Sequence, residues 1–427
     1  MAVSIVGAGY VGSSVAACLA EFGHDVVTVD IDEEVVAAIN DGRSPIHEPG
    51  LPELVESHAG HNLRATTDYD AVLDTDLTFI AVQTPSREDG SIDLAVVRAA
   101  TETLGETLAR KDGRHTVVVK STVTPGTTED LVGPVLTGQS GKRVGADLGL
   151  AMNPEFQREG TAVADFLDPD KVVVGASDEA AVDMLRALYE PLIADAAFVE
   201  TGIREAETIK YVNNSFLAAK VSLVNDVGNV CKALDVDAYE VLGAVGLDDR
   251  ISERFMRSGL GWGGSCFPKD VDAFRAVARE HGYEPPLLDA AVAVNDGQPR
   301  RLVDLLESHL DLDGARVAVL GLAFKPGTDD VRNSRALDLL AELLARGADP
   351  VAYDPVAVEN AREVFPDLTY ADTAEAALRD ADAAAVATDW PEFDDLDWSV
   401  MSTAIVADGR HIEIAEDELL AYEGLCW

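Results

Sequence analysis

The sequence predicts an α/β protein in which two doubly wound parallel sheets are joined by a long central helix. Short runs rich in Val and Ile alternate with Ala-rich stretches of helical period up to residue 202, and the alternation returns from Arg316. Strands of parallel sheets are buried on both faces, so they appear as continuous apolar runs between helices. Between these two regions, residues 205–234 have the apolar spacing of one amphipathic helix.

The elements are assigned in chain order from these patterns. The first region is expected to contain strands at residues 2–6, 26–29, 77–82, 116–120, 148–152 and 172–175. The apolar side of the central helix consists of Ile209, Val212, Phe216, Leu217, Val221, Val224 and Val227. The last region is expected to contain strands at 316–320, 351–353 and 383–387, and to end near 405–407. These assignments predict three domains, at residues 1–202, 203–300 and 301–427.

The charge of the chain excludes nucleic acid as a partner. Its 33 Lys and Arg residues stand against 77 Asp and Glu residues, which gives a formal net charge of −44, whereas nucleic-acid binding needs a basic face. Hydrophobic residues make up 47% of the chain, too many for a disordered acidic segment. The acidic residues are spread along the sequence, and molar salt shortens the range of their mutual repulsion to about 3 Å. We therefore expect a globular protein from a salt-rich, halophilic cytoplasm.

The cysteines and the N-terminus indicate the compartment. Cys18, Cys231, Cys266 and Cys426 lie far apart and show neither metal-ligand spacing nor a disulfide framework. The sequence opens on an apolar strand, and no apolar run approaches the roughly 20 residues of a membrane span. We expect a soluble cytoplasmic protein with no metal site and no membrane association.

A glycine motif predicts a dinucleotide site. Gly7, Gly9 and Gly12 follow the first strand and precede a segment of helical pattern, and Asp30 ends the second strand. Such glycines let the backbone approach a pyrophosphate at a helix N-terminus, and the acidic residue accepts from a ribose 2′-hydroxyl. Because the Asp30 carboxylate would repel a 2′-phosphate, the motif favours NAD over NADP. The alternative is a purely structural glycine turn.

Cys266 is the candidate nucleophile. It lies in the glycine-rich segment 261–270, where a thiol is accessible to a ligand and Lys269 would favour its thiolate. Asp270 is four residues further on, close enough for its carboxylate to lie near the sulfur. The alternative, a buried small hydrophobic residue, is equally compatible with the composition of the segment.

Further candidates lie on the central helix and after the strands. Lys210 and Asn214 are four residues apart and share one helix face, which suits stabilisation of an oxyanion, or else they belong to a solvated face. The segment 153–160 follows a strand and carries two acidic residues, Glu155 and Glu159, that could act in acid-base catalysis. Thr84 and Thr122 follow two other strands in the same way.

Basic residues are scarce in this acidic chain, but several of them lie in and just after one loop. The segment 321–327 follows a strand and contains Lys325, with Arg332 and Arg335 close behind. A basic loop at a strand end predicts a phosphate site, and two successive nucleotide-type α/β units suggest two nucleotides.

The combined pattern resembles the nucleotide-sugar 6-dehydrogenases, and it does so over essentially the whole chain. The matching segments are residues 7–12, 48–51, 121–123 with 125–127, 153–160, 263–270, and 324–328 with Arg332. The resemblance is closest to the branch that oxidises UDP-glucose. It implies two Rossmann-like domains, one that binds NAD and one that binds the UDP sugar, and a helical dimerisation region between them.

The resemblance also implies a reaction, in which UDP-glucose, two NAD and water give UDP-glucuronate, a precursor of glycans, and two NADH. A water held by Thr122 and Asp270, near Lys210, takes the 6-hydroxyl proton, and Cys266 captures the resulting aldehyde as a thiohemiacetal that is oxidised to a thioester. Glu159, with Glu155, assists hydrolysis of the thioester. Lys210 and Asn214 stabilise the oxyanions.

Binding roles follow from the same resemblance. The NAD site is expected to consist of Gly7, Gly9, Tyr10, Val11, Gly12, Asp30, Thr84, Thr122, Glu159, Lys269 and Arg332. The substrate site is expected to consist of Glu155, Phe156, Arg158, Lys210, Asn214, Arg250, Phe255, Arg257, Gly263, Lys325 and Arg410. Phe255 would contact the uracil, and Lys325 and Arg257 the phosphates. Arg250 would reach the substrate of the neighbouring subunit, which implies a homodimer through the central helix and leaves further assembly open.

Other functions remain open at this point. GDP-mannose 6-dehydrogenases share the cysteine, lysine and glutamate positions, so the chemistry does not separate the two branches, and a UDP-N-acetylhexosamine 6-dehydrogenase is a more distant alternative. A two-electron alcohol dehydrogenase and a non-catalytic sugar-nucleotide sensor would not need Cys266. Three departures from the family pattern are Glu33 and its acidic neighbours where a basic residue is common, Asn333 in place of Glu, and His411 in place of Asn.

Overall fold

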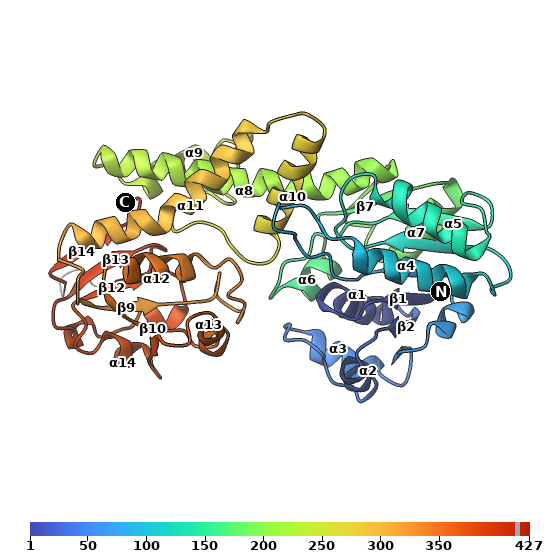
Figure 1. Cartoon of the computed structure of the whole chain (residues 1–427), viewed down its shortest axis with the longest axis horizontal. Coiled ribbons are helices and arrows are strands. Elements are labelled where there is room, and N and C mark those ends of the chain that lie inside the picture. Colours follow the sequence, from blue (N-terminus) through green and yellow to red (C-terminus); the bar gives the residue numbers. More distant parts are fainter. Residues whose placement is uncertain (415–418) are drawn as a thin grey trace. The chain divides into compact units, whose positions relative to one another are not determined.

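The computed structural model describes residues 1–414 and 419–427. The chain forms two compact units, Met1–Asn213 and Asn214–Trp427. The helix α8 (Ile203–Ala233) runs through the boundary, so its first turns belong to unit 1 and the remainder to unit 2 (Figure 1). Within the described ranges, no helix is both long and apolar enough to cross a bilayer.

Unit 1 alternates strands and helices in the predicted manner. Its strands are β1 (Ala2–Val6), β2 (Asp25–Val29), β3 (Leu63–Thr66), β4 (Leu77–Ile80), β5 (His115–Val119), β6 (Leu148–Met152), β7 (Lys171–Ala176) and β8 (Ala197–Thr201). Its other helices are α1 (Tyr10–Glu21), α2 (Glu33–Asn40), α3 (Leu51–His58), η1 (Tyr69–Asp74), α4 (Ala95–Leu108), η2 (Thr128–Val132), α5 (Gly133–Ser140), α6 (Ala162–Leu167) and α7 (Glu179–Leu188).

The strands of unit 1, all of whose residues are described, form an eight-stranded sheet in the order β3-β2-β1-β4-β5-β6-β7-β8. Successive residues of one strand point to opposite faces. Ile5 and Phe79 accordingly pack in the core that contains residues of α1, α3 and α7, whereas their neighbours Val6 and Ile80 pack in the core with α4 and α5. Burial on both faces explains why these strands are apolar throughout.

One strand pair departs from the predicted parallel sheet. β7 pairs with β6 in the antiparallel direction, with Met152 opposite Gly175, while every other strand pair of this sheet is parallel. The connection contains only the short helix α6, and the chain returns beside β6 without crossing back over the sheet. The amino end of β7, with Lys171, consequently lies at the edge of the sheet where β5 and β6 end.

Unit 2 contains the second sheet. Its strands are β9 (Arg316–Leu320), β10 (Asp349–Tyr353), β11 (Thr369–Tyr370), β12 (Ala383–Val386), β13 (Ile405–Asp408) and β14 (Ala421–Gly424). Its helices besides α8 are α9 (Ala238–Gly246), α10 (Phe267–Glu280), α11 (Pro286–Glu307), α12 (Arg335–Ala345), α13 (Val358–Val364), α14 (Ala374–Leu378), η3 (Pro391–Phe393) and η4 (Trp398–Val400). Within the described residues, six strands form one parallel sheet in the order β11-β10-β9-β12-β13-β14.

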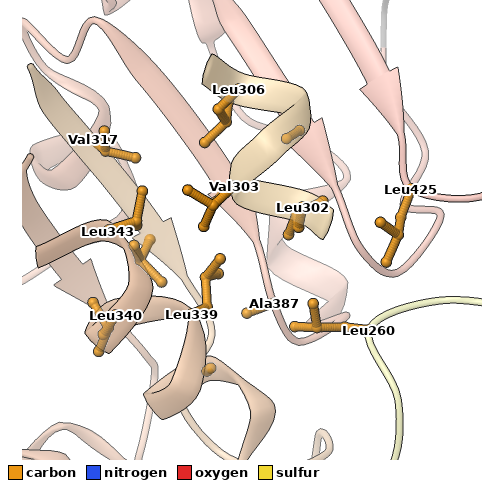
Figure 2. Close-up of a cluster of buried hydrophobic side chains, with 14 of the residues drawn as sticks. Leu260, Leu302, Val303, Leu306, Val317, Leu339, Leu340, Leu343, Ala387 and Leu425 are labelled. Atoms are coloured by element: carbon orange, nitrogen blue, oxygen red, sulfur yellow. The ribbon is translucent and has the colours of Figure 1, made fainter. Parts of the chain in front are cut away.

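The main core of unit 2 lies between this sheet and the helices α11 and α12. Figure 2 shows Leu302, Val303 and Leu306 of α11 facing Leu339 and its neighbours on α12, with side chains of the sheet beside them. These α11 and α12 leucines and valine are fully buried or nearly so. The core therefore joins the second half of α11 to the C-terminal sheet.

The predicted elements are confirmed to within about two residues, but four strands were missed. The central helix was expected at 205–234 and spans Ile203–Ala233. The missed strands are β3, β8, β11 and β14, all of which lie at sheet edges. An edge strand is only partly covered and needs few apolar residues, and β8 has no fully buried residue. The expectation that the second pattern ends near 405–407 was wrong, since β14 extends the sheet to Gly424.

Candidate active site

The turn after β1 has the backbone geometry that a pyrophosphate needs. Gly7 has a φ of +97°, and a Cβ there would lie 2.6 Å from the carbonyl oxygen of Ala81. The turn leads into α1, whose N-cap Gly9 makes no side-chain hydrogen bond to the helix amides. Because no side chain caps them, the first amides of α1 can receive an anion.

Asp30 stands beside this turn, directly after β2. Its carboxylate accepts hydrogen bonds from the amide of Ala8 at 2.5 Å and from the amide of Asp32 at 3.0 Å. The two bonds hold the half-buried carboxylate at the end of β2, where dinucleotide-binding sheets place the ribose contact.

A buried carboxylate without a predicted role ties α1 to the loop 153–160. Glu48 is 1% exposed and accepts hydrogen bonds from the amides of Gly160 at 2.8 Å and Ala162 at 2.6 Å. It also accepts one from the hydroxyl of Tyr10. Tyr10, predicted as an NAD contact, is therefore fixed to the loop that carries both candidate carboxylates.

The loop 153–160 and α8 share a buried ion pair. The Lys210 ammonium lies 3.0 Å from Oε1 of Glu155, and both side chains are buried. The other carboxylate oxygen of Glu155 accepts a hydrogen bond from the amide of Gln157 at 2.7 Å. Lys171 and Lys210 lie 4.4 Å and 5.7 Å from the ring centroid of Phe156. Lys210 therefore does not lie on a solvated helix face, the alternative left open by its spacing.

The loop that carries Thr122 is held from two sides. Ser121 donates a hydrogen bond from its hydroxyl to the carbonyl of Val82 at 2.6 Å. Glu207, which precedes Lys210 on α8 and is fully buried, accepts from the amides of Gly126 at 2.5 Å and Thr128 at 2.8 Å. Burial raises the pKa of Glu207. The helix that carries Lys210 thus anchors the Thr122 loop.

In unit 2, Cys266 is exposed at the N-cap of α10, whereas Cys18, Cys231 and Cys426 are buried. Burial raises the pKa of the Cys18 thiol to about 12 and that of Cys426 to about 11. The structure therefore excludes the alternative that Cys266 is a buried small hydrophobic residue. Of the four thiols, it is the one that a ligand can reach.

Asp270 lies one helical turn after Cys266 and is 1% exposed. Its amide donates to the carbonyl oxygen of Cys266 at 2.9 Å. Its carboxylate accepts from the side-chain amide of Asn214 at 2.6 Å and pairs with the ammonium of Lys269, also at 2.6 Å. Lys269, which we expected to favour the Cys266 thiolate, therefore directs its charge at Asp270. Asn214 is likewise buried in this group and does not lie on a solvated face.

The cysteine segment packs against the loop after β9. Gly264 has a φ of +81°, and a Cβ there would lie 2.8 Å from the ring of Phe324. Its amide donates to the carbonyl of Arg332 at 2.9 Å, and its carbonyl accepts from Asn333 at 3.1 Å. The absence of a side chain at Gly264 thus lets the segment with Cys266 lie directly on the loop that carries Lys325.

The predicted basic cluster of unit 2 is partly neutralised. Arg332 pairs with Asp330 at 2.7 Å, and Arg335 with Asp296 at 3.0 Å. The guanidinium of Arg410 donates to the carbonyls of Ala387 at 2.6 Å and Gly261 at 3.2 Å, and burial lowers its pKa. Arg410 therefore supports the glycine segment before Cys266, and Arg335 is tied down by an acidic neighbour.

Other predicted substrate residues lie at the surface. Arg250 is exposed and pairs with Asp248 at 2.6 Å, and Arg158 pairs with Asp165 at 2.6 Å. Phe255 is 41% exposed with a φ of +62°. The guanidinium of Arg257 lies 5.8 Å from the ring centroid of Tyr239.

Each unit thus gathers its own share of the predicted residues. Unit 1 holds Gly7, Gly9, Tyr10, Val11, Gly12, Asp30, Thr84, Thr122, Glu155, Phe156, Arg158, Glu159 and Lys210. Unit 2 holds Asn214, Arg250, Phe255, Arg257, Gly263, Cys266, Lys269, Asp270, Lys325, Arg332 and Arg410. Lys210 and Asn214 lie one turn apart on α8, which runs through both units.

Three models of one family match successive parts of the chain. The NAD binding domain of the UDP-glucose/GDP-mannose dehydrogenase family matches residues 1–193, its central domain 204–297, and its UDP binding domain 318–413. The chain belongs to this family. The resemblance inferred from the sequence motifs is thereby confirmed.

Relatives that match most of this chain carry the names of two different substrates. A UDP-glucose 6-dehydrogenase of Haloferax volcanii is 61% identical over 100% of both chains. A GDP-mannose 6-dehydrogenase of Pseudomonas syringae pv. tomato is 43% identical over 83% of this chain and 81% of its own length. The solved structure of a UDP-glucose dehydrogenase from Pyrobaculum islandicum is 44% identical, with a TM-score of 0.94 over 100% of this chain and 98% of that one. The expected halophilic source agrees with the Haloferax relative.

NAD is the cofactor of this dehydrogenase, as its family's first domain indicates. The glycine turn fits the group, because the Gly7 position leaves no room for a side chain and the N-terminus of α1 has no side-chain cap. Asp30 provides the acceptor for a ribose hydroxyl and opposes a 2′-phosphate.

Proposed function

We propose that the chain oxidises UDP-glucose to UDP-glucuronate in two successive steps at one site, with reduction of two NAD. The exposed thiol of Cys266 carries the proposal, since an enzyme that stopped at the aldehyde, or a sensor, would have no use for a nucleophile. The full-length similarity to a UDP-glucose 6-dehydrogenase supports the choice of substrate. The alternative substrate, GDP-mannose, is supported by relatives with lower identity and lower coverage.

The proposed chemistry assigns each step to side chains of this chain. NAD, when bound, accepts the electrons of each oxidation as hydride. Thr122 and Asp270 hold the water that takes the 6-hydroxyl proton. The Cys266 sulfur then forms a bond to the aldehyde carbon, and the second oxidation turns this adduct into a thioester. Glu159, with Glu155, directs a water to the thioester carbon, which breaks the carbon–sulfur bond and returns the thiolate.

The remaining charged groups have supporting roles in the proposal. Lys210 and Asn214 stabilise the negative oxygen that develops in each addition step, since hydrogen-bond donors in a buried site favour such an oxyanion. Lys325 and Arg257 neutralise the diphosphate, and Phe255 contacts the uracil. We also propose a cytoplasmic location, which agrees with four cysteines that are all free.

The stoichiometry of NADH tests this function. The purified protein in molar KCl is expected to form two NADH per UDP-glucose supplied, because the aldehyde stays bound until it is oxidised again. UDP-glucose, GDP-mannose and UDP-N-acetylglucosamine are each supplied in limiting amount, and NADH is read by absorbance. One NADH per sugar with free aldehyde would contradict the thioester, and turnover with GDP-mannose alone would contradict the substrate.

We further propose a homodimer through α8. Phe216, Leu223, Val230 and Leu234 are 70%, 63%, 54% and 68% exposed. They recur at intervals of seven and four residues, so they form one apolar stripe of the coiled-coil type along the helix. A second copy presents the same stripe and can cover it, as a two-fold interface requires. Arg250 would then lie near the neighbouring subunit.

A charged residue in the stripe is expected to separate the subunits. Phe216→Asp should halve the mass measured by light scattering, because a carboxylate cannot be buried at the centre of an apolar interface without a partner. Leu287→Asp is the control, since Leu287 is 74% exposed on α11 outside this stripe and should leave the mass unchanged. A wild-type monomer at micromolar concentration would contradict the dimer.

A further inference from the structure

Lys120 is a buried lysine for which the proposed chemistry has no use. It follows β5 directly, precedes the Ser121-Thr122 pair, and is 5% exposed. Its ammonium donates to the side-chain carbonyl of Asn153 at 2.9 Å, and within residues 1–414 and 419–427 no carboxylate lies within ion-pair distance of it. Burying a cation beside a neutral amide costs several kcal/mol. Such a residue calls for a functional explanation.

The contacts of Asn153 give part of that explanation. The side-chain carbonyl of Asn153 accepts a second hydrogen bond from the hydroxyl of Tyr189 at 2.6 Å, and its amide donates to the carbonyl of Val173 at 2.8 Å. Because Lys120 and Tyr189 both donate to its oxygen, the side-chain amide of Asn153 is held in one orientation. Lys120 thereby connects the ends of β5 and β6 at the residue from which the loop with Glu155 begins.

The charges around Lys120 give the rest of the functional explanation. Burial lowers the pKa of Lys120 to about 8, Glu155 raises it and Lys210 lowers it. Tyr189 is the other titratable group of this network, and burial raises its pKa, so it stays neutral. Below pH 8 Lys120 therefore adds a positive charge beside the Glu155–Lys210 pair. Three of the nine lysines of this acidic chain, Lys120, Lys171 and Lys210, lie around the loop 153–160.

We propose that Lys120 is a positioning residue of the active site, which orients Asn153 and adds a positive charge behind the Glu155–Lys210 pair. This inference rests on the proposed function, because it acts through two residues assigned there. The positive charge of Lys120 adds to the field in which the Glu155–Lys210 pair is held.

Lys120→Met tests the charge, with Lys120→Arg as the variant that keeps it. Removal of a positive charge raises the pKa of every neighbouring group, so each limb of the kcat-against-pH profile below pH 8 is expected to move up by about one pH unit in Lys120→Met. Lys120→Arg should keep those limbs in place. Lys111→Met is the control, since Lys111 also donates to neutral carbonyls, at Val72 and Leu73, and should not move the profile.

The outcomes separate a charge effect from a structural one. A Lys120→Met enzyme with the wild-type profile and only a lower melting temperature would overturn the proposal. Should Lys120→Met fail to fold, Lys120→Arg decides, because arginine keeps its charge above pH 8. A wild-type limb near pH 8, where Lys120 itself loses its charge, must then move upward in the arginine variant, while the limbs at lower pH stay in place. An unchanged limb near pH 8 overturns the proposal. The profile is measured with whichever nucleotide sugar is oxidised, so failure of the UDP-glucose assignment remains a separate result.

Discussion

A Cys266→Ser variant is expected to bind UDP-glucose and NAD but to form almost no UDP-glucuronate. A serine hydroxyl is a much weaker nucleophile than a thiolate and has no base assigned to activate it. The aldehyde formed in the first oxidation would therefore not be captured as a covalent adduct. We expect the rate of UDP-glucuronate formation to fall by about 10³-fold or more, as for the loss of other catalytic nucleophiles.

The measurement follows UDP-glucuronate and any aldehyde that is released. UDP-glucuronate is quantified by chromatography, and aldehyde is trapped with a hydrazine reagent. Cys231→Ser is the control, because it makes the same substitution at a buried thiol of α8 and should lower stability without changing the ratio of NADH to sugar. Two NADH per UDP-glucose in the Cys266→Ser enzyme would remove the nucleophile from the mechanism.

The fold could be predicted from the sequence wherever a strand is covered on both faces. β1, β6 and β9 were predicted with their observed bounds, because each is a short apolar run between helical segments. β3 was missed since only two of its four residues are buried. The direction of β7 was also out of reach, because an apolar run has the same pattern whichever way the strand points.

The candidate site also has features that the sequence predicts and features that it does not. Spacing along the chain predicted the glycine turn and the Lys210–Asn214 face, since both depend on residues a few positions apart. Partners that are distant in sequence leave no such pattern. Glu207 holds the amide of Gly126 across 81 residues, and Lys120 reaches Asn153 across 33. Glu48 lay in a matched motif, but its role follows from contacts with residues more than 100 positions away.

The role of Asp354 in the second nucleotide-type unit could not be predicted from the sequence. It stands after β10 as Asp30 stands after β2, so sequence alone would give both the same role. The carboxylate of Asp354 accepts from the amides of Leu322 and Ala323 at 2.7 and 3.1 Å and from the indole of Trp390 at 3.0 Å. It is 2% exposed. A carboxylate occupied in this way fixes the loop before Lys325 and cannot bind a ribose.

Lys210→Met is expected to damage both stability and activity, because it leaves Glu155 buried without its ion-pair partner. Breaking a buried pair from one side costs about 3 kcal/mol or more, which for a unit of this size lowers the melting temperature by roughly 6–12 °C. Loss of a donor to the developing oxyanion should also lower kcat by about 10²–10³-fold. Lys142→Met is the control, since Lys142 donates to the backbone carbonyls of Lys111 and Gly113.

The double variant Lys210→Met with Glu155→Gln separates the two effects. Once Glu155 is neutral, no carboxylate is left buried without its partner, so most of the lost thermal stability should return. Activity should not return, because no ammonium is restored to the oxyanion. The measurements are the melting temperature and kcat of the two single variants and the double variant in molar KCl. Additive losses of melting temperature would mean that the pair does not act as a unit, and recovery of kcat in the double variant would mean that Lys210 serves only to balance Glu155.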